Sequence, residues 1–167
     1  MKIGRITISD RASAGIYTDL SGPEIERLLG ETFGSEAQFV SAIVPDEIPQ
    51  IAGKLCDFSD REHCDLIVTT GGTGISPRDV TPEATREILE KELPGFGEIM
   101  RMQSFAKVRT AILSRATAGT RGTSLIVNLP GKPSAVAECL GFLAPALREG
   151  IAHLQGADPH TKPISTA

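Results

Sequence analysis

Residues 66–85 read LIVTTGGTGISPRDVTPEAT, a short apolar run followed by a glycine loop and the first turn of a helix. The apolar run at residues 66–68 is typical of a buried β-strand. Glycines at three of the four positions 71–74 then interrupt the pattern. Thr81-Pro82-Glu83 places a capping residue, a proline and an acid where the first turn of a helix prefers them. The segment therefore predicts a strand that leads through a tight loop into a helix.

The same succession of strand and helix recurs on both sides of this segment. Further strands are expected at residues 3–8, 37–44 and 125–129. Further helices are expected from Ser21 to Gly30 or Gly34, around residues 48–55, and at residues 94–108 and 134–154. Ser21 and Glu24 have the spacing of a capping box, whereas residues 111–123 give no clear pattern. Because strands alternate with helices, we expect an α/β fold, a three-layer αβα arrangement with a mostly parallel sheet.

Length and composition limit the possible classes of protein. The chain has 167 residues, which suits one compact domain, and we assign residues 1–156 to it and residues 157–167 to a flexible polar tail. The formal net charge is -4 and the chain has no Trp and one Tyr. An acidic surface repels polyanions, and few aromatic rings are present to stack on bases, so nucleic acid is excluded as a partner.

Cysteine usage and hydropathy indicate a reduced, water-exposed setting. The three cysteines, Cys56, Cys64 and Cys139, lack the spacing of a metal site and form an odd set, which disfavours a disulfide framework. The start of the chain has no signal-peptide apolar block, and no stretch reaches the length of a membrane span. We therefore expect a cytoplasmic protein that does not contact membranes.

Acidic residues follow three of the predicted strands. Asp10 follows the first strand, Asp46 the second, and Asp79 comes shortly after the glycine loop of the third. Ligands of an open parallel sheet bind beyond the carboxyl ends of its strands, and carboxylates are preferred ligands of Mg²⁺, which phosphate transfer needs. Asp46 and Asp79 are thus the candidate catalytic acids and magnesium ligands, and Asp10 is a second-tier candidate. Each also has a structural alternative, a helix N-cap for Asp46 and Asp79 and an Asx turn for Asp10.

The glycine loop has no bulky side chains, so a phosphate or a flat heterocycle can approach its backbone N–H groups. A simple tight turn would use the same glycines. The loop lacks the dinucleotide fingerprint, which needs Gly where Pro77 stands. The later Gly131-Lys132 pair lacks the Walker A pattern, since Ile126 replaces its first glycine and Pro133 follows the lysine.

Basic side chains and histidines give weaker evidence for a functional site than the acids and the glycine loop. Arg78 and Lys132 follow strand ends, where they would either contact phosphate or remain solvated. The three histidines are His63, His153 and His160. They lie on different elements, so the sequence predicts neither a metal cluster nor a Ser-His pair.

Four segments together resemble the MogA-type molybdopterin adenylyltransferases, a group within the molybdopterin-binding family. The first is Thr69-Thr70-Gly71-Gly72-Thr73-Gly74 followed by Arg78-Asp79-Val80-Thr81-Pro82-Glu83-Ala84-Thr85. The others are Ser9-Asp10-Arg11-Ala12-Ser13 with Tyr17-Thr18-Asp19 and Ser21-Gly22, then Pro94-Gly95-Phe96-Gly97-Glu98 with Met100-Arg101, and Leu113-Ser114-Arg115 with Asn128-Leu129-Pro130-Gly131-Lys132-Pro133. Molybdenum-insertase domains and competence-damage-like proteins share the glycine loop and the Pro-Gly segment, but the single-domain length favours the adenylyltransferases.

The resemblance implies a molybdopterin-binding-like fold and a specific reaction. In it, the terminal phosphate of molybdopterin attacks the α-phosphate of MgATP, giving adenylylated molybdopterin and pyrophosphate. It implies that Asp46 and Asp79 are the catalytic acids and Mg²⁺ ligands, and it implies a homotrimer with a molybdenum insertase as a possible partner. The substrate-binding residues that it implies are Gly71, Gly72, Thr73, Gly74 and Arg78 on the phosphate side, and Ser114, Asn128, Pro130, Gly131 and Lys132 on the pterin side.

Two other functions are compatible with the same residues. A non-catalytic module that binds or delivers molybdopterin would keep the glycine loops without needing the acids. A nucleotide-binding α/β domain with an unrelated substrate would not bind molybdopterin at all.

Overall fold

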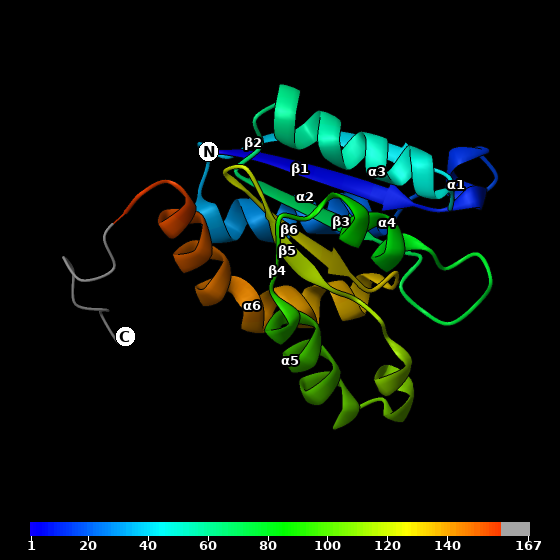
Figure 1. The fold of residues 1–167 in the computed structure, drawn as a ribbon. Helices are drawn as coiled ribbons and strands as arrows, with labels where there is room; N and C mark the ends of the chain where they lie inside the picture. The colour runs from blue at the N-terminus through cyan, green and yellow to red at the C-terminus, as the bar shows by residue number, and fades with distance from the viewer. Residues whose placement is uncertain (158–167) are drawn as a thin grey trace.

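One six-stranded sheet forms the centre of the computed structural model, which describes residues 1–157 (Figure 1). Its strands are β1 (Lys2–Ile8), β2 (Gln38–Val44), β3 (Leu66–Thr70), β4 (Lys91–Glu92), β5 (Ala118–Arg121) and β6 (Ser124–Leu129). Their order across the sheet is β2-β1-β3-β6-β5-β4. Strands β2, β1, β3 and β6 are parallel, whereas β5 is antiparallel to β6 and β4 is antiparallel to β5. The predicted mostly parallel sheet is confirmed.

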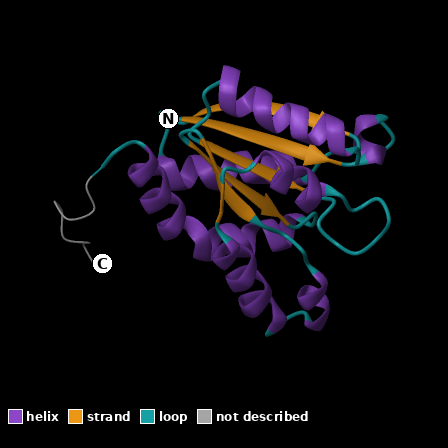
Figure 2. Cartoon of the chain, viewed as in Figure 1, coloured by secondary structure: helices purple, strands orange, loops and turns teal. Residues whose placement is uncertain are grey.

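Helices cover both faces of the sheet, as Figure 2 shows. They are α1 (Asp10–Ser13), α2 (Ser21–Phe33), α3 (Ile48–Cys56), the π-helical turn η1 (Asp57–Arg61), α4 (Thr81–Ile88), α5 (Pro94–Phe105), the 3₁₀ turn η2 (Arg109–Leu113) and α6 (Pro133–Leu154). Helices α2, α5 and α6 pack on one face, and α3, η1 and α4 pack on the other. The predicted three-layer αβα architecture is therefore confirmed.

The two halves of the core follow from the alternation of side chains along each strand. In β3, Leu66 and Val68 pack toward α2 and α6, whereas Ile67 packs toward α3 and α4. In β6, Val127 and Ile126 divide in the same way. All five side chains are fully buried. Burial on both faces explains why the central strands are continuous apolar runs.

Some local expectations differ from the structure. The capping box at Ser21 is wrong, because Ser21 is already helical and its hydroxyl donates to the carbonyl of Gly131 at 2.7 Å. Asp19 instead accepts the amide of Gly22 at 2.9 Å. The helix predicted to reach residue 108 ends at Phe105. Strands β4 and β5 were not expected.

Two expectations concern the ends of the chain and the membrane. The last helix, α6, ends at Leu154, and the predicted tail lies outside the described residues from position 158 onward. Within residues 1–157, none of the helices has the length and apolar character that a membrane crossing needs.

Candidate active site

A cavity lies where the order of the strands reverses. From β1 the chain passes to β2 on one side, and it then crosses back to β3 on the other side of β1. In open α/β sheets this switch point is where ligands bind. The cavity has a volume of about 180 Å³ and is lined by Ile8 and Ser9 at the end of β1, Thr70 and Gly71 at the end of β3, and Gly131 after β6. Three strand ends thus form one pocket.

The glycine loop at residues 71–74 lies against the end of β1. Gly71 and Gly72 have φ angles of +99° and +61°, in the left-handed region that favours glycine. A Cβ atom at Gly71 would lie 2.2 Å from the carbonyl oxygen of Ile8. Thr81 fixes the loop from the start of α4, since its hydroxyl donates to the Gly71 carbonyl at 2.9 Å and its amide to the Gly72 carbonyl at 3.1 Å. The loop is therefore bare and held from two sides.

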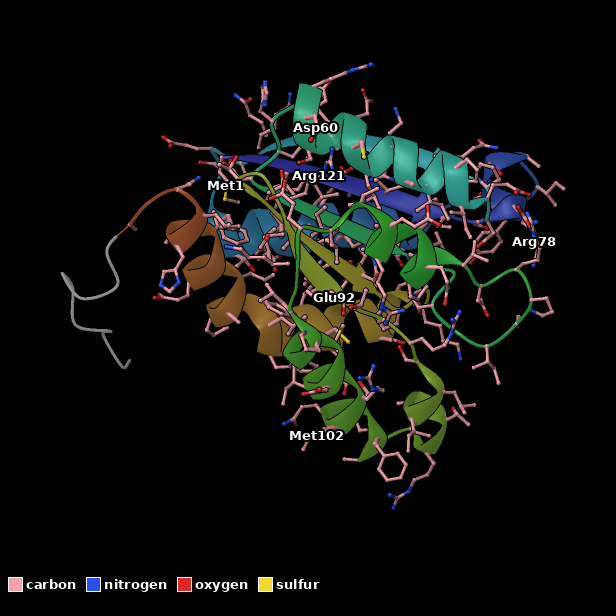
Figure 3. All side chains as sticks on the ribbon, viewed as in Figure 1. Met1, Asp60, Arg78, Glu92, Met102 and Arg121 are labelled. Carbon is pink, nitrogen blue, oxygen red and sulfur yellow. The ribbon has the colours of Figure 1, made fainter. Side chains whose placement is uncertain are left out.

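Asp10 and Asp46 lie together beside this loop. The amide of Asp10 donates to Oδ2 of Asp46 at 2.8 Å, and the amide of Asp46 donates to Oδ1 of Asp10 at 3.0 Å. Arg78 donates to both oxygens of Asp10, at 3.0 and 2.9 Å, and its Nη2 lies 2.8 Å from Oε1 of Glu47. In Figure 3, Arg78 lies at the end of the molecule where α1 and the long loop before α4 meet. Glu47, and not Asp46, is the residue that precedes α3 as its N-cap.

The two acids differ in their electrostatic environment. Burial raises the pKa of Asp46 above its ordinary value, and the negative charges of Asp10 and Asp79 raise it further. The hydrogen bonds from Arg78 lower the pKa of Asp10. Asp46 is thus a partly desolvated carboxyl beside other acids, and Asp10 is an ionised partner of an arginine.

Asp79 approaches the same loop from its far end. A Cβ atom at Gly74 would lie 2.8 Å from Oδ2 of Asp79, just as a Cβ atom at Gly72 would lie 2.9 Å from Oδ1 of Asp46. Oδ2 of Asp79 also accepts the amide of Ser76 at 2.8 Å. Asp46 and Asp79 therefore flank one glycine loop within a single chain. Among the described residues, no group of three or more His, Cys, Asp or Glu side chains is arranged to hold a metal ion.

Other predicted site residues lie near this loop in supporting positions. Thr73 is buried, and its carbonyl accepts the amide of Arg115 at 2.9 Å. The Pro130 carbonyl accepts the hydroxyl of Thr70 at 2.7 Å, which brings the Pro-Gly segment against the glycine loop. Lys132 precedes α6 as its N-cap residue and is exposed.

Of the five residues predicted on the pterin side, Gly131 lines the cavity, whereas Ser114, Asn128, Pro130 and Lys132 do not. Asn128 is fully buried, and its Nδ2 donates to the hydroxyls of Thr69 at 3.0 Å and Thr85 at 2.9 Å. It links β6, β3 and α4 beneath the loop. The hydroxyl of Ser114 accepts the amide of Ala116 at 3.3 Å, in the segment between η2 and β5.

Sequence reasoning did not select Asp19, which lines the cavity. Its side chain is 8% exposed and accepts hydrogen bonds from Nη1 of Arg5 at 2.8 Å and from the hydroxyl of Thr7 at 2.7 Å. A Cβ atom at Gly22 would lie 2.3 Å from Oδ2 of Asp19, so the pair needs glycine there. The signal was available, because an arginine in the middle of an apolar strand requires a buried acidic partner.

Comparison with known proteins agrees with this architecture. The family model described as a probable molybdopterin binding domain matches residues 4–149. The molybdopterin adenylyltransferase of Helicobacter pylori strain 26695 is 53% identical over 145 residues, which are 87% of this chain and 82% of that protein. The molybdopterin adenylyltransferase of Escherichia coli K12 is 44% identical over 140 residues, 84% of this chain and 72% of that protein.

A solved structure is similar over almost the same length. The molybdopterin biosynthesis enzyme MoaB of Thermus thermophilus superposes with a TM-score of 0.84 at 42% identity, covering 93% of this chain and 96% of that one. The family model and the similar proteins each match most of the chain, and the chain belongs to the molybdopterin-binding domain family.

Proposed function

We propose that this protein is a molybdopterin adenylyltransferase of molybdenum-cofactor biosynthesis. It transfers AMP from MgATP to the terminal phosphate of molybdopterin and releases pyrophosphate. The similarity to adenylyltransferases that share about half of its residues over most of their length supports this activity.

The observation that carries the proposal is the position of Asp46 and Asp79 on either side of the loop at residues 71–74. A phosphate oxygen of molybdopterin attacks the α-phosphorus of ATP, the bond to the bridging oxygen breaks, and pyrophosphate leaves with the electron pair. Both reacting groups belong to substrates, so the protein acts by alignment and electrostatic stabilisation without a covalent intermediate. The bare backbone of the loop and the charge of Arg78 would hold the phosphates.

The donor set suits a magnesium ion that arrives with ATP. Mg²⁺ usually keeps water and phosphate ligands and takes only one or two carboxylates from a protein. Asp46 and Asp79 are such a pair, and they would supply carboxylate oxygens to the ion. When bound, the ion offsets negative charge on the phosphates.

The pterin side of the site is proposed to include Ser114, Pro130, Gly131 and Lys132. Asn128 would act on that side through its hydrogen bonds to Thr69 and Thr85, because its own side chain is buried. The free state of Cys56, Cys64 and Cys139 supports a reducing, cytoplasmic setting.

We further propose a homotrimer that passes its product to a molybdenum insertase. Apolar side chains on α5, η2 and the turn between them support an interface, since Met102, Val108 and Ile112 are 70%, 55% and 64% exposed. A separate apolar groove is lined by residues at the start of α5 and on α6, namely Leu93, Pro94, Gly95, Phe96, Ile99, Leu143 and Ala146. Light scattering on the purified protein measures the subunit number directly.

Pyrophosphate release tests the proposed activity. Purified protein with molybdopterin, ATP and Mg²⁺ under reducing, anaerobic conditions should release pyrophosphate and form an adenylylated pterin. Absence of product from folded protein would argue strongly against the enzyme. Calorimetry then distinguishes the remaining functions: a delivery module binds molybdopterin with little dependence on Mg²⁺, and an unrelated nucleotide-binding domain does not bind it.

A further inference from the structure

The side chain of Arg115 connects both ends of the loop that carries Asp79. Arg115 lies between η2 and β5. Its Nε donates to the carbonyl of Gly74 at 2.6 Å, and its Nη2 donates to the carbonyl of Asp79 at 2.5 Å. Its own amide donates to the carbonyl of Thr73 at 2.9 Å. One residue from a distant part of the chain thus makes three hydrogen bonds to the backbone on this side of the site.

The loop has little else to fix it from outside. Ile75 is 66% exposed, and the loop runs out into solvent between Gly74 and Asp79. The two bonds between Ser76 and Asp79 close a small turn, but both are internal to the loop. Arg78 supplies a second attachment, yet its side chain is 54% exposed, whereas that of Arg115 is 34% exposed. Arg115 is therefore the better-shielded anchor.

The geometry of a guanidinium group gives this contact its effect. Its donors lie in one plane at fixed spacing, so two carbonyls bonded to it are held at a fixed separation. Holding the carbonyl of Asp79 also limits the direction of its carboxylate, which points back toward Gly74. We propose that Arg115 is a positioning residue that holds Asp79 in place for adenylyl transfer without touching substrate.

A partner on α4 keeps Arg115 in this orientation. Its Nη1 is paired with Oε1 of Glu83. The other oxygen, Oε2 of Glu83, is buried and has no hydrogen-bond partner among the described residues. Glu83→Gln therefore removes the ion pair but leaves both carbonyl bonds of Arg115 available. The variant separates the effect of the ion pair from the effect of the two carbonyl bonds.

Steady-state kinetics, which rests on the proposed function, gives the first test. A lysine has one ammonium group and cannot bridge two carbonyls in a fixed plane, so Arg115→Lys and Arg115→Ala should each lower kcat by about tenfold or more. The KM for molybdopterin should stay nearly constant, and Glu83→Gln should keep most of kcat. A kcat for Arg115→Lys within about twofold of the wild type would overturn the inference.

Arg121→Ala is a matched control for the loss of an arginine. Arg121 is 28% exposed and pairs with the carboxylate of Asp60 and the carbonyl of Ile88, but it does not contact the loop. Figure 3 shows Arg121 and Asp60 together, away from Arg78. This variant should keep the wild-type kcat even if it lowers the melting temperature. An equal loss of kcat in Arg121→Ala and Arg115→Ala would mean that general destabilisation explains both.

A double variant tests whether Arg115 acts through Asp79. If it does, Arg115→Lys should lower kcat little further in the Asp79→Asn background, because the carboxylate that Arg115 positions is already lost. Losses that multiply in the double variant would show that Arg115 acts independently of Asp79.

Amide hydrogen exchange gives a readout that needs no activity. In folded Arg115→Lys, exchange at the amides of Ser76 and Asp79 should accelerate while the amides of β3 keep their protection. Unchanged exchange at Ser76 and Asp79 would overturn the positioning role. If the wild type releases no pyrophosphate, the proposed function fails, but exchange still decides whether Arg115 holds the loop.

Discussion

Asp10 and Asp46 hold each other in place, because the amide of each donates to a carboxylate oxygen of the other, at 2.8 and 3.0 Å. The ends of β1 and β2 are thereby fixed to each other. The pair leaves Oδ1 of Asp46 beside the glycine loop, while Arg78 occupies both oxygens of Asp10. Asp46 is therefore better placed than Asp10 to act on a substrate.

Asp79→Asn should keep the fold and the binding of molybdopterin but lose most turnover. The amide keeps an oxygen that can accept the Ser76 amide, whereas the negative charge next to the phosphates is lost. We expect kcat to fall about 100-fold, measured as pyrophosphate release, with circular dichroism unchanged. Wild-type turnover in this variant would remove Asp79 from catalysis.

The pH dependence of turnover should report the raised pKa of Asp46. Turnover needs the ionised carboxylate, so the acidic limb of kcat/KM should lie above the ordinary value of 3.8. Asp10→Asn removes a neighbouring negative charge, which lowers the pKa of Asp46 and should move the limb to lower pH. A limb that stays in place or moves upward would contradict the assignment to Asp46.

The same shift has a consequence for stability with a definite sign. Folding raises the pKa of Asp46, so the folded state binds its proton more tightly than the unfolded state. The contribution of Asp46 to stability should therefore fall as the pH rises from 3.8 to the folded pKa, and stay low above it. Asp10 has a lowered pKa, so its contribution is present above 3.8 and is lost as the pH falls through the folded value. Urea unfolding of the wild type and of Asp46→Asn, measured across the acidic pH range, separates the contribution of Asp46 from that of Asp10.

Gly71→Ala should destabilise the protein strongly. At a φ of +99°, its new Cβ atom would lie 2.2 Å from the carbonyl oxygen of Ile8, and the free energy of unfolding should fall by about 3 kcal/mol or more. Gly141→Ala is the control, because Gly141 is an exposed position inside α6 where a Cβ atom meets nothing within 4 Å. That change should stabilise by about 0.5 to 1 kcal/mol. Equal urea midpoints for both variants would contradict the strain at Gly71.

Asp19→Asn tests the buried ion pair between Arg5 and Asp19, the acid that lines the cavity. The side chains of Arg5 and Asp19 are 12% and 8% exposed, so water screens their interaction only weakly. Glu26 remains as a partner of Arg5, and we therefore expect a loss of about 2 kcal/mol in the free energy of unfolding. Glu24→Gln, which alters the exposed pair with Arg27, should leave the urea midpoint unchanged.

The fold was predictable where the sequence pattern is strongest. The buried strands β3 and β6 are apolar runs with clear ends, and the crossover helices follow them in order. Strand β4 is missed because its two residues, Lys91 and Glu92, are exposed and polar. Strand β5 has only four residues, and the first three are all buried, so it shows no apolar-polar alternation to detect. The Ser21 cap is wrong because a carbonyl 110 residues away binds its hydroxyl, which local spacing cannot reveal.

The site was predictable as a set of strand ends and not as a set of contacts. Topology places Asp10, Asp46 and the glycine loop at one edge of the sheet, and the structure brings them together. The burial of Asn128 and the carbonyl contacts of Arg115 depend on pairings between distant segments. Residue type and spacing do not specify such pairings.

The hydroxyls of Thr70 and Ser21 each donate at 2.7 Å to consecutive carbonyls, those of Pro130 and Gly131. Three segments from distant parts of the chain are thereby joined in the lining of the cavity. Replacing residues 130–132 alone with those of a relative would disturb both hydrogen bonds, and replacing either of the other segments alone would disturb one of them. Redesign of the pocket therefore requires that residues 17–22, 70–74 and 130–132 be exchanged as one unit.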